Sequence, residues 1–257
     1  MLLVTVSQSV GHVAPAVSDA IQQLNRGSHV VDWLIVTEQN PPCDPNGIIM
    51  QNLEKARHYA VQLAYDYMFI VENDVVVPKH ALMSLMNLGD VAVGLYPERP
   101  SKTGTDEFLV CMSCNDNKAA RKHIEKGKPF LLTGRGGYGC VVIKHHVFSK
   151  IKFPVGDMSW YDILHSEGFK VMCSPHVICF HIDHTAEGKP VIRAPEYVYD
   201  FWKKVIENNK KNGGSWFHGL PYIWWWGMNP DKFLEQLPIH LGRTVFAEEK
   251  WFLYGRS

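Results

Sequence analysis

Apolar runs alternate with stretches of helical periodicity along the first hundred residues. Continuous apolar runs indicate buried strands, and apolar residues three or four positions apart indicate helices that cover a core. The predicted strands are residues 2–7, 30–37, 67–71 and 91–95, and the predicted helices are residues 15–24, 53–65 and 79–88. Because the run at 67–71 is apolar throughout, we expect both of its faces to be covered, as in a parallel sheet. The alternation predicts an α/β fold with a mostly parallel central sheet, right-handed crossovers and flanking helices.

The pattern is less regular after residue 100. We predict strands at residues 106–111, 130–133, 139–143, 169–173 and 177–180, and helices at residues 145–151, 161–167 and 195–212. The tail beyond residue 212 is rich in tryptophan, with Trp216, Trp224, Trp225, Trp226 and Trp251. No internal repeat or low-complexity linker divides the chain. We therefore expect one domain over residues 1–190, with a helical, Trp-rich extension over residues 191–257 packed on it.

Composition narrows the class of protein. Lys plus Arg and Asp plus Glu number 26 each, and a net charge of zero argues against coating of nucleic acid or anionic membrane. With 46% hydrophobic and 20% charged residues the composition is globular. No apolar run reaches the ~18 residues of a membrane span, and the start lacks the basic segment of a signal peptide. Several of the six cysteines lie in apolar runs, as reduced buried thiols do, so we expect a cytoplasmic protein.

The strongest chemical signal lies at the end of the predicted strand 67–71, where Glu72, Asn73 and Asp74 follow directly. In open α/β sheets ligands bind at the carboxyl ends of the strands. Carboxylate oxygens at that edge suit Mg²⁺ or Mn²⁺, which in turn suit a nucleoside diphosphate. The alternative is a polar strand end that runs into an Asn-Asp turn. This segment alone does not decide between the two.

Further segments follow in a recognisable order, among them residues 139–148, 160–162 and 177–184. Together with residues 72–74, their order and spacing resemble the GT-A-fold, family-2-like glycosyltransferases over roughly residues 1–185. The resemblance implies a GT-A-like (Rossmann-like) catalytic domain, with a nucleotide-binding half over 1–100 and an acceptor and metal half over 101–190. It also implies a nucleotide-diphosphate sugar as donor, Mn²⁺ or Mg²⁺ as cofactor, and inverting transfer to a hydroxyl of a glycan or other acceptor.

Individual roles follow from the same resemblance. Residues 72–74 look like the family's DxD motif with Glu72 in place of the first Asp, so Asp74 is expected to bind the metal. Glu72 is expected at the ribose, or at the metal through water. Asp162 stands where the family has its acidic base, although Tyr161 replaces the first member of the usual acidic pair. The alternative for Asp162 is a carboxylate at a helix N-terminus, stabilised by the helix dipole.

The second metal ligand is expected to be a histidine late in the domain. His181 lies 13 positions after Gly168, close to the family's metal-binding histidine, and His184 is the alternative. Imidazole is a competent Mn²⁺ ligand, while the plain interpretation is a core histidine.

Nucleotide contacts are expected from helix and strand residues near the start of the chain. Arg57 matches a basic helix residue that faces the donor nucleotide in such enzymes, the alternative being a solvated helix residue. Thr5 and Ser7, at the end of the first strand, are expected near the nucleobase.

The glycine-rich segment 133–139 lacks the Gly-Lys-Ser/Thr ending of a phosphate-binding loop. The resemblance makes it a loop that lines the sugar pocket through Gly137 and Gly139, with Tyr96 and Arg99 nearby. The alternative is a set of tight turns.

Three tryptophans in a row, Trp224 to Trp226, leave several roles open. They suit an acceptor platform, a homodimer contact, plain core packing or peripheral contact with a membrane surface.

Two other functions compete with glycosyl transfer. A sugar-nucleotide nucleotidyltransferase would need basic residues after the first strand, where residues 7–12 carry little positive charge. A non-catalytic carbohydrate-binding protein would use the tryptophan cluster as its ligand face.

Overall fold

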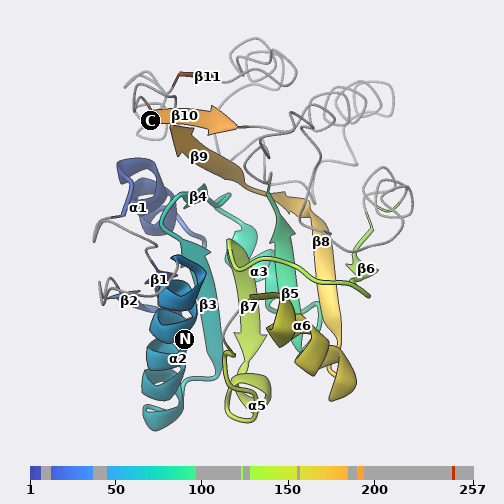
Figure 1. Ribbon diagram of the computed structural model, residues 1–257. Helices are drawn as coiled ribbons and strands as arrows, with labels where there is room; N and C mark the ends of the chain where they lie inside the picture. The colour runs from blue at the N-terminus through green and yellow to red at the C-terminus, as the bar shows by residue number, and fades with distance from the viewer. Residues whose placement is uncertain are drawn as a thin grey trace.

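The computed structural model describes residues 1–6, 13–36, 45–96, 123, 128–154, 157–184, 190–193 and 245–246 of the 257-residue chain. In chain order the first half contains β1 (Leu2–Val6), α1 (Pro15–Gln22), β2 (Asp32–Val36), α2 (Pro45–Gln62), β3 (Tyr67–Glu72), β4 (Val75–Val76), α3 (Ala81–Leu85) and β5 (Val91–Leu95). The second half contains β6 (Phe130–Leu131), β7 (Cys140–Lys144), α5 (His145–Phe148), α6 (Asp157–Ser166), β8 (Val171–Ile178), β9 (Phe180–His184), β10 (Pro190–Arg193) and β11 (Val245–Phe246). The order confirms the predicted α/β alternation (Figure 1).

The described strands form a seven-stranded sheet in the order β2-β1-β3-β7-β5-β8-β6. The pairs β1–β2, β1–β3 and β5–β8 are parallel, whereas β7 is antiparallel to both of its neighbours and β6 is antiparallel to β8. Five strands therefore run one way and two run the other, so the sheet is mixed, which corrects the mostly parallel sheet of the prediction. The apolar run of β7 could not disclose its direction, because a strand buried on both faces has the same pattern either way.

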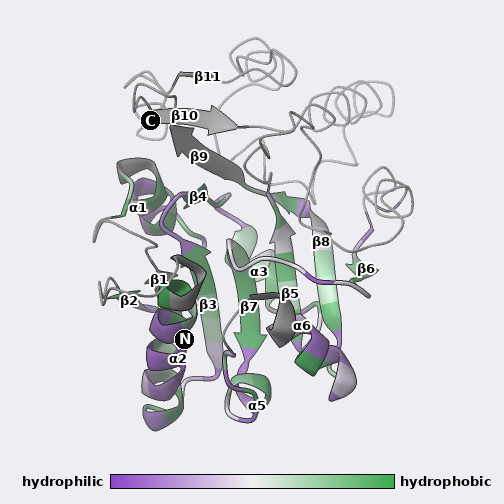
Figure 2. Cartoon of the chain, in the orientation of Figure 1, coloured by the Kyte–Doolittle hydropathy of each residue, from purple (hydrophilic) through white to green (hydrophobic). Residues whose placement is uncertain are grey.

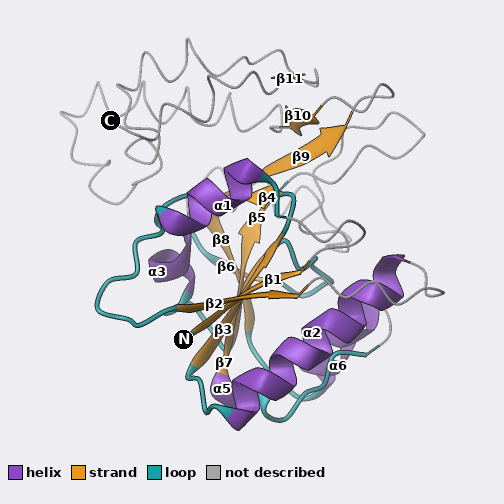
Figure 3. Cartoon of the chain, turned by 90° about the vertical axis from the view of Figure 1, so that its left-hand side faces the viewer, coloured by secondary structure: helices purple, strands orange, loops and turns teal. Residues whose placement is uncertain are grey.

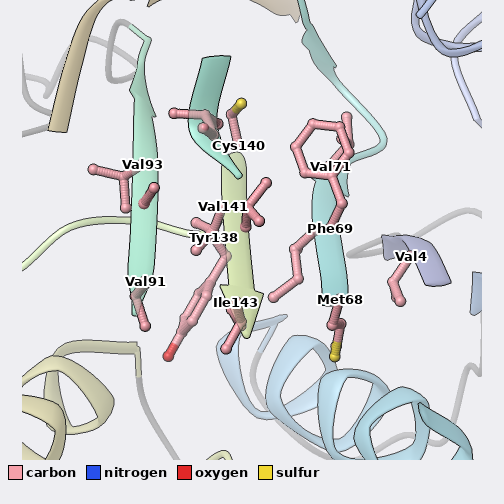
Figure 4. Close-up of a cluster of buried hydrophobic side chains, with 14 of the residues drawn as sticks. Val4, Met68, Phe69, Val71, Val91, Val93, Tyr138, Cys140, Val141 and Ile143 are labelled. Carbon is pink, nitrogen blue, oxygen red and sulfur yellow. The ribbon is translucent and has the colours of Figure 1, made fainter. Parts of the chain in front are cut away.

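Helices cover both faces of this sheet. Viewed from its side, the sheet has α1 and α3 on one face and α2, α5 and α6 on the other (Figure 3). Between them the central strands are hydrophobic along their length (Figure 2). Figure 4 shows the resulting core, in which Phe69 and Val71 of β3 lie beside Val141 of β7 and Val93 of β5, all of them fully or almost fully buried.

Helix α2 begins at Pro45, eight residues before the predicted start at residue 53. Proline is accepted in the first turn of a helix because its missing N–H has no partner there in any case. Pro45 is therefore the first residue of the helix and does not prevent it from forming. No helix among the described residues is long and apolar enough to cross a membrane.

A second, four-stranded sheet in the order β11-β10-β9-β4 lies above one end of the first sheet in Figure 1. Strand β8 pairs with β5 as far as Ser174 opposite Gly94, and the register then jumps to Ile178 opposite Leu95. The three extra residues form a bulge, and such bulges bend a strand and redirect it. After this bulge the chain leaves the first sheet and continues as β9, which pairs with β4. The two strands predicted at 169–173 and 177–180 are therefore one bulged strand and the start of the next.

Candidate functional site

The predicted acidic motif lies where β1 and β3 end together, because Val6 is opposite Glu72 in their parallel register. We call this the carboxyl edge of the sheet. The turn of Asn73 and Asp74 follows at once and leads into β4. The backbone N–H of Ala14, just before α1, donates to the carbonyl of Asn73 at 3.2 Å, and the side chain of Asp74 is only 9% exposed. The turn is thus held in place and its aspartate is nearly buried.

Strand β9 brings the predicted metal-binding histidine to this turn. His181 is directly opposite Val75 in the antiparallel pair β4–β9. Directly opposite residues have Cα atoms about 4.5–5.5 Å apart and consecutive ones about 3.8 Å apart, so the Cα atoms of Asp74 and His181 lie within about 9 Å of each other. His184 is opposite Pro190 in the neighbouring pair, about 10 Å further along β9. Of the two candidates, the backbone register therefore places His181 beside the motif.

The donor types at this place fit a divalent cation. Carboxylate oxygen and imidazole nitrogen are donors of the kind Mn²⁺ accepts, and the backbone places one residue of each type at neighbouring positions here. β9 is described by its backbone pairing. Over the side chains that the structure describes, no group of three His, Cys, Asp or Glu residues forms a complete metal site.

The glycine-rich segment borders the motif. The carbonyl of Gly139 accepts a hydrogen bond from the N–H of Glu72 at 3.3 Å, which joins the segment to the end of β3. A Cβ on Gly137 would lie 1.8 Å from the hydroxyl oxygen of Tyr96, and a Cβ on Gly139 would lie 2.7 Å from its Cζ. The Tyr96 hydroxyl in turn accepts a hydrogen bond from the Gly139 N–H at 3.1 Å. The close approach that these glycines permit is to Tyr96, which lies beside them as the sequence suggested.

Helix α6 fixes the other side of this segment. The hydroxyl of Tyr161 donates to the carbonyl of Gly137 at 2.8 Å, and Nε2 of His165 is 2.8 Å from the carbonyl of Gly134. Arg135 forms a two-pronged ion pair with Asp162, with Nε–Oδ1 at 3.0 Å and Nη2–Oδ2 at 2.6 Å. The segment from 134 to 139 therefore connects the predicted base on α6 to the predicted metal motif at the end of β3.

Asp162 itself differs in two respects from the expectation. The helix begins at Asp157 rather than near residue 161, so Asp162 lies in its interior and not at its N-terminus. The alternative of a carboxylate stabilised by the helix dipole is therefore excluded, since that effect is confined to the first turn. The side chain is 51% exposed, and both of its oxygens contact Arg135. Arg135 was missed in the sequence, although its place among four glycines was a signal that it belongs to a closely packed segment.

Arg57 is not brought to the carboxyl edge. Its guanidinium is buried, donates to both oxygens of Glu54 at 2.7 Å, and donates through Nη1 to the carbonyl of Phe148 at 3.0 Å. Phe148 follows β7, whose last residue Lys144 is opposite Tyr67 at the start of β3, which is the other edge of the sheet. Burial raises the pKa of Glu54, but the hydrogen bonds from Arg57 and from the Phe153 N–H outweigh it and lower the pKa. Arg57 is neither solvated nor near the motif, and it joins α2 to α5.

Thr5 also has an internal partner. It is fully buried, and its hydroxyl accepts a hydrogen bond from Nε1 of Trp33 on β2 at 2.9 Å. This bond couples the two strands β1 and β2 beside the carboxyl edge. Ser7, Arg99 and the tryptophans Trp224 to Trp226 lie outside the described residues.

The described cysteines supply no nucleophile. Cys140, Cys173 and Cys179 are reduced thiols and fully buried. Burial raises the pKa of the Cys179 thiol, with further contributions from Cys140 and Cys173, so this side chain stays protonated.

No protein-family model matches the chain, and no curated protein matches it at a significant level. Among solved structures, the A197 protein from STIV aligns with a TM-score of 0.47 at 16% identity, over 75% of this chain and 94% of that one. The inositol-1-phosphate CTP transferase from T. maritima aligns with a TM-score of 0.39 at 12% identity, over 77% of this chain and 94% of that one.

Proposed function

We propose that this protein is a divalent-cation-dependent glycosyltransferase that moves a sugar from a nucleoside-diphosphate sugar to a hydroxyl acceptor with inversion. The observation that supports the proposal is the pairing of β4 with β9, which sets His181 opposite Val75, the residue that follows Asp74. Residues more than a hundred positions apart in the sequence thereby meet at the edge of an α/β sheet where ligands bind. If Asp74 were only a buried core carboxylate or part of a plain turn, its position would not call for a histidine beside it on a strand of the second sheet.

Each group has a separate task in this proposal. Asp74 and His181 hold the cation, and a cation bound there neutralises the charge that develops on the leaving diphosphate. Glu72, two positions before Asp74, lies at the ribose or at the outer side of the cation. The segment 134–139, held by Tyr96 and Tyr161, forms a rigid wall beside them.

Asp162 is the general base. As the acceptor oxygen forms its bond to the anomeric carbon, the bond from that carbon to the diphosphate oxygen breaks, and the acceptor proton passes to the carboxylate of Asp162. The nucleoside diphosphate leaves with the electron pair. Arg135 holds the carboxylate in one orientation through two hydrogen bonds, which is how a bidentate pair fixes geometry.

The test is to incubate the full chain with a panel of UDP-, GDP- and dTDP-sugars and Mn²⁺, and to measure the nucleotide released. A glycosyltransferase slowly releases nucleoside diphosphate by hydrolysis of its cognate donor, and this release stops with chelator and in Asp74→Asn. His58→Ala is the matched control, because His58 is an exposed histidine of α2. Release of pyrophosphate from a nucleoside triphosphate and a sugar phosphate would instead identify a nucleotidyltransferase. Sugar binding with no nucleotide binding would identify a carbohydrate-binding protein.

A further inference from the structure

The bulge in β8 is the point at which the chain changes sheets. Ser174 is opposite Gly94 and Ile178 is opposite Leu95, so residues 175–177 have no counterpart on β5. The pairing then ends with a hydrogen bond from the Cys179 N–H to the Leu95 carbonyl at 2.6 Å. Two residues later His181 is opposite Val75. Whatever holds the bulge in shape therefore also sets where His181 arrives.

Packing holds one side of the bulge. Val177 is fully buried, and its Cγ1 lies 2.7 Å from the place where a Cβ on Gly94 would be. Sγ of Cys140 occupies the same region at 2.9 Å from that place. Val177 can therefore fold onto β5 only because residue 94 is glycine.

A hydrogen bond holds the other side. His80 is 4% exposed, and its Nε2 is 2.8 Å from the carbonyl oxygen of His176, the middle residue of the bulge. Since a carbonyl only accepts, Nε2 carries the proton and donates. His80 lies four residues after β4, next to Lys79, whose carbonyl accepts a hydrogen bond from the Asn25 N–H at 2.7 Å. The bond thus ties the segment that follows β4 to the segment that precedes β9.

We propose that His80 is a positioning residue, whose hydrogen bond to the bulge carbonyl of His176 keeps β9 in the register that brings His181 beside Asp74. This inference rests on the proposed function for its consequence, because it assigns to His80 the support of the cation site. Burial keeps the imidazole uncharged by lowering the pKa of His80 to about 4, so the bond is made by the neutral side chain at neutral pH.

The first experiment measures the anchor itself. Hydrogen exchange is followed by mass spectrometry in wild type, in His80→Leu, which removes the donor, and in His80→Gln, whose amide nitrogen reaches a place similar to Nε2. His145→Leu is the matched control, because Nδ1 of His145 makes an equivalent 2.8 Å bond to the carbonyl of Tyr65 at the opposite edge of the sheet. We expect faster exchange over residues 175–184 in His80→Leu alone. Unchanged exchange there, or equal acceleration in the control, overturns the inference whether or not the protein binds a metal.

The second experiment measures the consequence for the cation. Mn²⁺ affinity is measured by titration with electron paramagnetic resonance on the same four proteins. Residues that orient metal ligands typically change affinity by about 10- to 100-fold, so we expect a loss of about 10-fold or more in His80→Leu. We also expect most of the affinity back in His80→Gln and none lost in His145→Leu. Wild-type protein that binds no Mn²⁺ would contradict the proposed function, whereas unchanged affinity in His80→Leu would contradict the role of His80.

Discussion

Replacing Gly137 with alanine tests how closely the segment beside the motif is packed against Tyr96. The new Cβ would lie 1.8 Å from the Tyr96 hydroxyl oxygen and 3.0 Å from its Cζ. No real contact is as short as the first, so either the ring or the segment must move. Tyr96 is 9% exposed, and its hydroxyl is held by the Gly139 N–H at 3.1 Å, so neither can move freely.

The expected cost follows from these contacts. Forcing extra volume into a packed core costs about 1–3 kcal/mol, so Gly137→Ala is expected to lose about 2 kcal/mol of unfolding free energy or more. Tyr96→Phe alone loses the acceptor of the Gly139 N–H, about 1 kcal/mol. In the double variant the clashing oxygen is gone and the 3.0 Å contact with Cζ remains. We therefore expect the two changes together to cost about 1–2 kcal/mol less than the sum of the single changes.

The assay is urea unfolding of the two single variants and the double variant, followed by circular dichroism. Gly139→Ala provides the control, because its Cβ would meet the ring carbons Cζ, Cε1 and Cε2 at 2.7, 2.8 and 2.9 Å, and phenylalanine keeps all three. Gly139→Ala should therefore be nearly additive with Tyr96→Phe. Additivity in both pairs, or the same coupling in both, would refute the packing that the structure assigns to this segment.

Three other changes have outcomes that the structure determines. Between pH 6.5 and 4, His80 becomes protonated in the unfolded chain but stays neutral in the folded protein, where its pKa is lowered to about 4. The free energy of unfolding should therefore fall by up to about 3 kcal/mol on acidification, as measured by urea unfolding. This part of the fall should be absent in His80→Leu. Arg57→Met should destabilise the fold by about 2–3 kcal/mol, because it removes the ion pair with Glu54 and the hydrogen bond to the Phe148 carbonyl. The affinity for the donor nucleotide, measured by calorimetry, should stay unchanged. Weaker donor binding would show that Arg57 contributes to the nucleotide site. Asp162→Asn should leave donor affinity intact and lower kcat by about 10²-fold or more, and full turnover would remove Asp162 from the role of base.

Much of the fold was predictable because buried elements have a local pattern of apolar residues in the sequence. The run at 67–71 and the run at 91–95 are apolar at every position, and both became central strands with the predicted bounds or nearly so. The pairing partner and the direction of each strand have no such local pattern. β4 has two residues, and β9, with which it pairs, follows a bulge about a hundred positions away, so the second sheet could not be predicted from periodicity.

The location of the candidate site was predictable where it depends on the end of a buried strand and on the chemistry of the residues that follow it. Asp74 follows a buried strand, and that alone located the carboxyl edge. Arg57 shows where prediction from sequence fails, because a basic side chain on a helix is equally suited to bind a nucleotide or a neighbouring carboxylate. Its partner Glu54 lies three residues before it, within one helical turn. Only the tertiary contact with Phe148 shows that the side chain faces the interior at the other edge of the sheet.

The most direct test of the account is whether the imidazole of His181 coordinates a cation together with Asp74. Electron spin echo spectroscopy of the protein with bound Mn²⁺ detects nitrogen attached to the metal. We predict a coupling to one histidine nitrogen that disappears in His181→Ala and persists in His184→Ala, with Mn²⁺ affinity lost in Asp74→Asn. Bound Mn²⁺ with no nitrogen coupling, or a coupling that survives His181→Ala, would contradict the convergence of the two strands on one cation.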